Sequence, residues 1–400
     1  MPPAKETRNP FLADDESEVQ PPQNLKEYAY QLKPWLTLAL LGLENTADNS
    51  KNVPIILDGQ AVTGEVRLDL GSRGDAGSIR AISISIRGRI ITGAAPSEMV
   101  TSLEIPSTLW TRTPTTKLKG QHVLPFSMTL PPSVSLPSFG GQKEEFRLPP
   151  SFYERHTRAQ VEYDVTVHLT RKMRPDYRLS TVINYMPVSR PGPPSGLRQL
   201  AYQQHVPLPG PDSDPEGWRT SHFVKTQGRL TSTSRLVEAR CNLSLATPLC
   251  YTRGTTIPCA IVIESSDPHT LDLLSFPDSI ALRLRRNVRF HSGEKNPTHY
   301  TELAKLVWKE ELDHSELASW RPAAEKVLDS DAIAMYAHRR TLKGEIHLRS
   351  DLIPSAAMAH FRIEYSVVLF PFDAPDYESL DGEPLIMEPV EIASDYPDAL

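Results

Sequence analysis

The second half of this chain repeats the pattern of its first half. Three blocks of alternating apolar and polar residues occur at 59–68, 82–88 and 161–167, and again in the same order at 254–263, 280–286 and 363–369. The two copies are offset by 195, 198 and 202 residues. A period this long exceeds that of a solenoid repeat and matches the size of one domain. The chain is therefore predicted to contain two copies of one domain.

The repeated blocks have the pattern of half-buried strands. In residues 82–90 isoleucines alternate with serines and arginines around Gly88, and in residues 161–169 apolar residues alternate with polar ones. This period of two is typical of a strand with one face in the core. Clusters of Gly, Pro and Ser separate such segments, which favours an antiparallel sandwich. We predict an all-β fold of two tandem immunoglobulin-like β-sandwiches with disordered termini.

Composition sets the expected domain limits. They are a disordered acidic N-terminal tail at 1–32, a first sandwich at 33–187, a Pro-rich linker at 188–217, a second sandwich at 218–372 and an acidic C-terminal tail at 373–400. An insertion is expected in the second copy at about 296–338. Within it, residues 298–312 have helix-like periodicity, and Thr298 is a candidate cap, so a partly helical insertion is predicted.

The linker is rich in proline, which is excluded from central strands, so it is expected to be exposed. Its R-P-G-P-P-S-G segment contains P-x-x-P, which is the form of an SH3 ligand. Arg190 lies one residue away from the spacing that such ligands need, so the linker interpretation is favoured.

Charge is unevenly spread along the chain. The formal net charge is −6, from 43 bases and 49 acids. The two tails hold 14 of those acids and two of the bases, which leaves residues 24–372 with 41 bases and 35 acids. Solvated tails are the favoured explanation. The alternative is that a basic face of the body meets phosphates or anionic lipid.

Signals of catalysis, metal binding or cofactor binding were not found. The sequence contains no nucleophile-elbow, zincin, phosphate-loop or C-x-x-C motif. Cys241, Cys250 and Cys259 are nine residues apart, which fits no zinc-ligand spacing, and their odd number suits reduced thiols. The N-terminus has no apolar signal region. We therefore expect a cytoplasmic chain that is not an enzyme and has no metal or cofactor.

The densest basic run contains Arg283, Arg285 and Arg286. A solvated outer strand face is the favoured interpretation. The sharper alternative is a contact with phosphate or anionic lipid, at the plasma membrane or endosomes, because arginine pairs with phosphate through two parallel hydrogen bonds. No aromatic side chains interleave with this run, which argues against nucleic acid as a partner.

Two short motifs in the tails are candidate partner sites. Asn9, Pro10 and Phe11 form N-P-F, the ligand of endocytic EH domains, which present a pocket for one aromatic anchor. Tyr377 and Leu380 fit the Y-x-x-Φ signal that clathrin adaptors bind by strand addition. Both motifs are short enough to occur by chance.

The duplicated pattern resembles the arrestin fold, and specifically the α-arrestin trafficking adaptors. The matching blocks of the first copy are 59–68, 82–88, 125–131, 148–152 and 161–167, and those of the second copy are 251–259, 342–348 and 352–365. The resemblance implies two sandwiches of arrestin type. It also implies a non-enzymatic adaptor that links membrane cargo proteins to ubiquitin ligases and endocytic modules.

The chain departs from this family in one motif. Family members recruit WW-domain ligases through P-P-x-Y, and this chain has none; Pro149 begins a near match with Phe152 at the tyrosine position. That segment is expected to be packed in the fold. Two alternatives remain open: a retromer-type coat subunit of the same fold, and a β-sandwich hydrolase or carbohydrate-binding protein.

Overall fold

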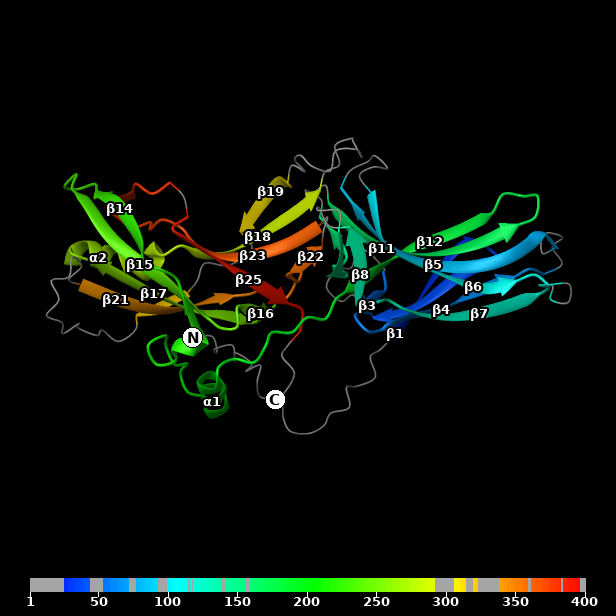
Figure 1. The fold of residues 1–400 in the computed structure, drawn as a ribbon, viewed down its shortest axis with the longest axis horizontal. Coiled ribbons are helices and arrows are strands. Elements are labelled where there is room, and N and C mark those ends of the chain that lie inside the picture. Colours follow the sequence, from blue (N-terminus) through cyan, green and yellow to red (C-terminus); the bar gives the residue numbers. More distant parts are fainter. Residues whose placement is uncertain are drawn as a thin grey trace, which may run out of the picture.

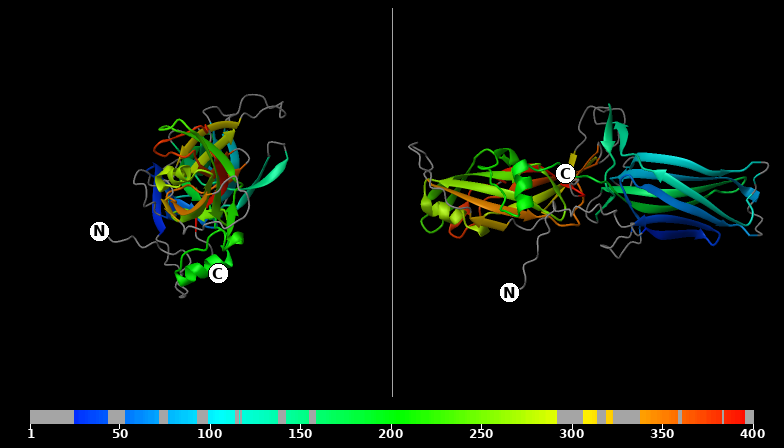
Figure 2. Two further views of the ribbon diagram at one scale, coloured as in Figure 1. Left: turned by 90° about the vertical axis from the view of Figure 1, so that its left-hand side faces the viewer. Right: turned by 90° about the horizontal axis from the view of Figure 1, so that it is seen from below.

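The computed structural model describes most of the chain. The described residues are 25–43, 53–71, 77–92, 99–113, 116, 118–137, 142–154, 159–291, 306–313, 319–322, 338–358, 361–382 and 384–395. They form an elongated molecule of two β-rich halves placed end to end (Figures 1 and 2). Within them, no helix has the length and apolar character needed to cross a bilayer.

The first half is a curled ten-stranded sheet with an adjacent hairpin. Its main path runs β6-β5-β11-β12-β3-β2-β4-β7, with β1 on β2 and β10 on β11. The strands are β1 (Leu25–Lys33), β2 (Leu36–Leu43), β3 (Ile55–Leu57), β4 (Ala61–Asp69), β5 (Ile79–Ile91), β6 (Met99–Thr111), β7 (Gln121–Thr129), β10 (Phe152–Tyr153), β11 (Gln160–Arg171) and β12 (Tyr177–Met186). The separate hairpin is β8 (Ser133–Pro137) with β9 (Lys143–Arg147).

The second half has two sheets. The first follows β20-β21-β17-β15-β14-β24 with β13 on β15, and the second follows β16-β25-β23-β18-β19 with β22 on β23. The strands are β13 (Trp218–Thr220), β14 (Val224–Leu230), β15 (Leu236–Ala246), β16 (Cys250–Thr252), β17 (Thr256–Ser265), β18 (Leu282–His291), β19 (Leu306–Asp313), β20 (Ser319–Pro322), β21 (His338–His347), β22 (Ala356–Met358), β23 (Phe361–Leu369), β24 (Tyr377–Ser379) and β25 (Ile386–Ala393). The α-helices of the described residues are α1 (Gly196–Gln204), which lies between the two halves in the sequence, and α2 (Pro268–Leu274).

The sequence repeat has a counterpart in strand pairing. In the first half β5 pairs antiparallel with β11, β4 pairs with β7, and β3 runs parallel to β12. In the second half β18 pairs antiparallel with β23, β17 pairs with β21, and β16 runs parallel to β25. Gly59 and Gly254 open the first repeated block, and both have a positive φ, 76° and 79°. Each glycine makes the same tight turn before a core strand, a conformation that costs other residues energy.

The all-β sandwich prediction is confirmed, and its physical basis is the alternation read from the sequence. Ile82, Ile84 and Ile86 are fully buried, while the two serines between them and the arginine that follows are half-buried. Most of the buried apolar side chains of the described residues form one cluster that runs through both halves, and within it Phe152 of β10 and Phe361 of β23 meet with ring centroids 5.1 Å apart.

The C-terminal segment differs from the predicted tail. Residues 373–400 contain β24 and β25, and β25 pairs with β23 at the centre of a sheet. Ile386, Val390 and Ile392 are buried, and Glu391 lies on the opposite, exposed face. Glu388 has the parity of the buried residues, is half-buried and lies 3.6 Å from Arg219. A segment of acidic composition therefore contains a core strand. At the other end, β1 begins at Leu25, inside the predicted tail at 1–32.

Two further segments differ from expectation. The described parts of the insertion are the strands β19 and β20, because β19 adds to β18 and β20 adds to β21. Residues 306–312 of the predicted helical stretch are therefore strand, and this pairing overrides local periodicity there. Thr298 and the rest of that stretch lie outside the described residues. The expected linker at 188–217 contains α1, which Ser195 caps by accepting a hydrogen bond from the Arg198 backbone N–H.

Helix α1 is attached to the second half. Arg198 is 4% exposed and donates to the carbonyl oxygens of Gly217 and Thr247. The Arg198 side chain thus satisfies backbone carbonyl groups that no sheet pairs, which helps to explain how this proline-rich segment is ordered without joining a sheet.

Candidate functional site

The predicted basic strand is β18, and its arginines divide between two faces. Arg283 and Arg285 are half-buried on the outer face. Their guanidinium carbons lie 5.8 and 4.9 Å from the ring centroid of Phe370, within cation–π distance. Arg289 follows on the same face and pairs with Glu364, with Nε 2.9 Å from Oε2.

Arg286 does not belong to this outer face, which corrects the grouping of all three arginines. It is 3% exposed, because side chains alternate along a strand and Arg286 has the parity of Leu284 and Val288. Its guanidinium Nη2 lies 2.6 Å from Oε1 of Glu154, a residue of the first half. Arg286 is therefore a junction residue and is not placed to meet a membrane.

The junction between the halves is built around this ion pair. The Arg286 guanidinium carbon lies 6.0 Å from the Phe152 ring centroid, and Phe152 in turn packs on Phe361. Strand β9 of the first half lies against β22 of the second. Beside the pair, burial raises the pKa of Tyr365 to about 12, although the nearby Arg286 charge acts in the opposite direction.

A second set of contacts joins the end of β25 to the segment that leaves β12. The Ser189 backbone N–H donates to Ser394 Oγ at 2.8 Å, and the Ser394 N–H donates to Ser189 Oγ at 3.1 Å. Arg190 Nη2 lies 3.1 Å from an Asp395 carboxylate oxygen. The C-terminal strand thus holds the start of the interdomain segment, a contact that the sequence gave no direct sign of.

The near match to P-P-x-Y is packed, as expected. Phe152 is 1% exposed and pairs with Val161 of β11. Ser151 donates its backbone N–H to the Tyr185 carbonyl oxygen. Tyr153 is 63% exposed, but its neighbours in the motif are held in the fold.

Tyr377 and Leu380 lie in different environments. Tyr377 is 7% exposed on β24 and its ring fills the space above Gly228, where an added Cβ would lie 2.2 Å from the ring. Burial raises the pKa of Tyr377. Leu380 is 49% exposed. A clathrin adaptor could bind both side chains only if β24 separated from β14. Asn9, Pro10 and Phe11 lie outside the described residues.

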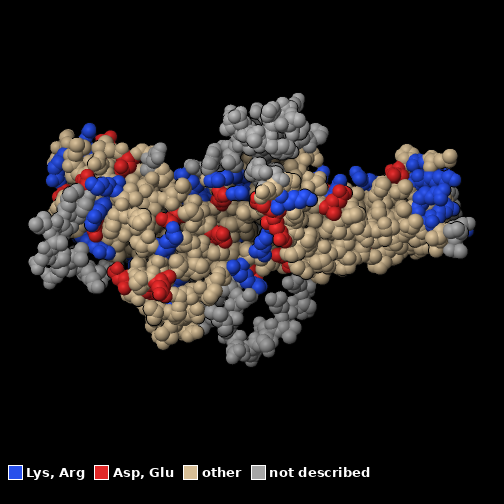
Figure 3. All heavy atoms as spheres, in the orientation of Figure 1, with Lys and Arg blue, Asp and Glu red and all other residues tan. Residues whose placement is uncertain are grey.

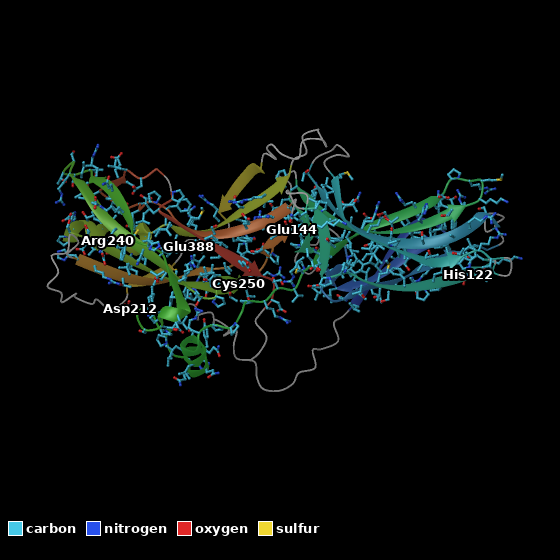
Figure 4. All side chains as sticks on the ribbon, viewed as in Figure 1. His122, Glu144, Asp212, Arg240, Cys250 and Glu388 are labelled. Atoms are coloured by element: carbon cyan, nitrogen blue, oxygen red, sulfur yellow. The ribbon has the colours of Figure 1, made fainter. Side chains whose placement is uncertain are left out.

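Cys241 and Cys259 are buried free thiols, and Cys250 is a half-buried one. Burial raises the pKa of Cys241 to about 12 and of Cys250 to about 11, and it raises the pKa of Cys259 as well. Figure 4 shows Cys250 on β16 at the side of the second half. Thiols with such pKa values are weak nucleophiles at neutral pH. In the part of the chain that the structure describes, no group of three His, Cys, Asp or Glu side chains could hold a metal ion.

A comparison with known protein families shows what the first half of the chain is similar to. Residues 46–189 match the family model "Arrestin (or S-antigen), N-terminal domain". Over residues 46–189 this chain is similar to an arrestin N-terminal domain. The matched segment runs from just before β3 to just after β12, so it includes the strands of the repeat's first copy. No curated protein matches the chain.

The chain is thus arrestin-like, and its second half repeats the strand pairing of the matched half. Arrestins are generally non-enzymatic, and the domain indicates an arrestin-type trafficking or adaptor protein. The sequence reasoning missed the pairing of Arg286 with Glu154. Strand parity alone places Arg286 inward, but its partner lies 132 residues away and no local pattern marks it.

Proposed function

We propose that this chain is a non-catalytic cytosolic adaptor that links membrane cargo proteins to endocytic or ubiquitin-ligase machinery. The arrestin N-terminal domain at 46–189 carries this proposal. The second copy of the same strand framework supports it, because two sandwiches in line offer long surfaces and open sheet edges for a partner's strand or tail. We place the two domains at about 25–187 and 218–395, with residues 188–217 between them.

Ligase recruitment would differ from the P-P-x-Y mode. Phe152 stands where that motif has its tyrosine, and it is packed against Phe361. A WW domain could reach this segment only after the junction opened. A ligase would therefore bind another surface or arrive through an intermediary.

The proposed endocytic contact is the N-terminal tail. Asn9, Pro10 and Phe11 present one aromatic anchor, which suits the pocket of an EH-type module. Tyr377 and Leu380 are proposed as a second signal only for a form in which β24 has separated from β14. Arg283 and Arg285 are proposed to contribute to contact with an anionic membrane, without Arg286.

Proximity labelling in cells, followed by affinity purification of the tagged chain, tests this proposal. An adaptor should label membrane proteins together with endocytic or ubiquitin-ligase components, at low stoichiometry. A single stoichiometric complex would favour the coat-subunit alternative and contradict the proposal.

The tail motif has its own matched pair of variants. Phe11→Ala should remove labelling of EH-domain proteins, whereas Val19→Ala, a similar truncation in the same tail, should leave it unchanged. Equal labelling by both variants would show that the tripeptide is incidental, without affecting the adaptor proposal.

A further inference from the structure

Four strands of the first half end together at the tip farthest from the second half. The Lys172 backbone N–H donates to the Ser78 carbonyl oxygen at 2.7 Å, and the Arg112 N–H donates to the Arg80 carbonyl oxygen at 2.8 Å. These bonds join the β11–β12 turn, the start of β5 and the end of β6. Figure 4 places His122 of β7 at the same end of the molecule.

Basic side chains gather on this tip. Arg80, Lys172 and Arg174 are exposed, and Arg112 and Arg171 are half-buried. Figure 3 shows a dense area of Lys and Arg side chains at the right-hand end of the molecule. The carboxylate of this turn is Asp176, and its oxygens already accept the Arg171 backbone N–H at 2.8 Å and lie 3.1 Å from His168 Nε2.

An apolar side chain projects from the centre of these charges. Met173 stands between Lys172 and Arg174 and is 94% exposed. Its φ is 54°, a conformation that is rare for a residue other than glycine and that turns the chain sharply. The turn therefore presents methionine at its apex.

The base of the turn is rigid. The Arg171 guanidinium carbon lies 3.9 Å from the centroid of the Tyr177 ring, and its Nε donates to the Pro175 carbonyl oxygen at 2.7 Å. Trp35 packs edge-on against the same tyrosine, with ring centroids 5.2 Å apart. The position of Met173 is thus fixed by contacts below it.

The corresponding turn of the second half has the opposite charge. The segment between β23 and β25, residues 370–385, takes the place of the β11–β12 turn and contains five Asp or Glu residues and no Lys or Arg. The shared strand framework therefore does not by itself produce a basic turn at this position. Of the two corresponding turns, the one in the first half is basic.

We propose that this basic tip binds the surface of an anionic lipid bilayer, with Met173 entering the headgroup region. The tip is a convex projection with an apolar apex and a cationic collar, which suits a flat anionic surface. A peptide partner would instead be expected to need a groove or an open strand edge. Each basic residue near such a surface strengthens binding by about fivefold.

Sedimentation of the purified full chain with vesicles tests this inference. The vesicles contain phosphatidylcholine alone or with phosphatidylserine. The wild-type chain is expected to sediment with the anionic vesicles only, and raised salt should weaken binding because exposed charges are screened over about 8–10 Å. Lys172→Glu with Arg174→Glu should reduce binding by about 25-fold or more. Met173→Ser should reduce it several-fold with little change in the salt dependence.

One charge-matched control locates the site. Arg219→Glu with Arg229→Glu changes exposed residues of the second half and should sediment like wild type. Arg283→Glu with Arg285→Glu, on the outer face of β18 that is proposed to share the membrane contact, should lose less binding than the tip variant, and a larger loss than that of the tip variant would contradict the proposal. Circular dichroism confirms that each variant is folded.

The proposal fails if the Lys172 and Arg174 variant sediments like wild type, or if the second-half control loses binding equally. It also fails if the chain ignores anionic vesicles but is captured by a polyglutamate resin, since the tip would then be a site for acidic peptides. The adaptor function is judged separately by cellular labelling, and it stands whether or not the tip binds lipid.

Discussion

Gly88 and Arg286 occupy the same place in the two halves. Gly88 lies opposite Tyr163 on β11, and Arg286 lies opposite Tyr365 on β23. Both tyrosines are buried and donate to a backbone carbonyl oxygen about one strand upstream, Tyr163 to Pro149 at 2.8 Å and Tyr365 to Ile353 at 2.6 Å. The two frameworks agree in register and in this hydrogen bond, and differ in one side chain.

That difference shows how a repeated domain acquires an interface. At Gly88 an added Cβ would lie 2.9 Å from the Tyr163 ring, so this side of the first half is closed by its own packing. In the second half Arg286 extends past Tyr365 and reaches Glu154 of the first half. The contact between the two halves is therefore asymmetric, because it uses an arginine that the second copy has and the first copy lacks.

The largest expected effect is at this position. Arg286→Ala should lower the free energy of unfolding by about 3 kcal/mol, the lower end for breaking a buried ion pair, because Glu154 is left near the junction without its cation and is partly reached by water. Urea denaturation measures the change. Arg289→Ala is the matched control, since Arg289 pairs with Glu364 on the solvent side of the same strand and should cost less than about 1 kcal/mol. Equal losses for the two variants would contradict a special role for Arg286.

The shared tyrosine bond sharpens the comparison next. Tyr163→Phe and Tyr365→Phe each leave a carbonyl without its donor and should cost about 1–2 kcal/mol. Because the two bonds are equivalent, the two losses should agree within about 0.5 kcal/mol when measured by the same denaturation. A large loss in one half and none in the other would show that the frameworks are not energetically equivalent.

The paired turn glycines provide a parallel test. Gly59→Ala and Gly254→Ala should each cost about 1–2 kcal/mol, because both positions have a positive φ. Gly192→Ala is the control, because Gly192 has an ordinary φ and open space around it, and this change should be nearly neutral. Gly71→Ala is less suited as a control, because Gly71 also has a positive φ. Thermal unfolding of the three variants compares them, and a neutral Gly254→Ala would contradict the equivalence of the turns.

The smallest effect concerns helix α2, which among the described residues belongs to the second half and has no counterpart in the first. Asp267 caps α2 by accepting the Thr270 backbone N–H and hydroxyl, and these bonds, with the Arg235 charge, lower the pKa of its carboxyl. Asp267→Ala should cost about 1 kcal/mol at neutral pH.

This contribution has a defined pH dependence. A lowered pKa in the folded state stabilises the fold above the ordinary aspartate pKa of about 3.9, and the stabilisation is lost as the pH falls through the lower folded value. The difference in unfolding free energy between wild type and Asp267→Asn should therefore shrink on acidification below about pH 4. A difference that grew on acidification would contradict the assigned cause.

The repeat made much of this fold predictable from sequence. Strict alternation in residues 82–90 and 161–169 located the central strands, and the aligned blocks located their counterparts. The last strand was missed because the nine acids of residues 373–400 gave the whole segment the composition of a tail. Extending the repeat from β12 would have found β25, whose partner β16 mirrors β3.

The junction could not be predicted in the same way. Arg286 has inward parity, which the alternation of Leu282 and Leu284 already indicates. Its partner depends on how two copies are placed against each other, which no period within either copy encodes. Similarly, residues 306–312 of the helix-like pattern form a strand, because pairing with the edge of β18 outweighs their local periodicity.

A double-mutant cycle between Arg286 and Glu154 tests the central claim, that one copy is joined to the other through this pair. The cycle uses Arg286→Ala, Glu154→Ala and both together, each measured by urea denaturation of the full chain. We expect the double variant to lose at least about 1 kcal/mol less than the sum of the two single losses, since each single change removes the same contact. Losses that add within about 0.3–0.5 kcal/mol would show that the two residues are not coupled and would contradict this account of the junction.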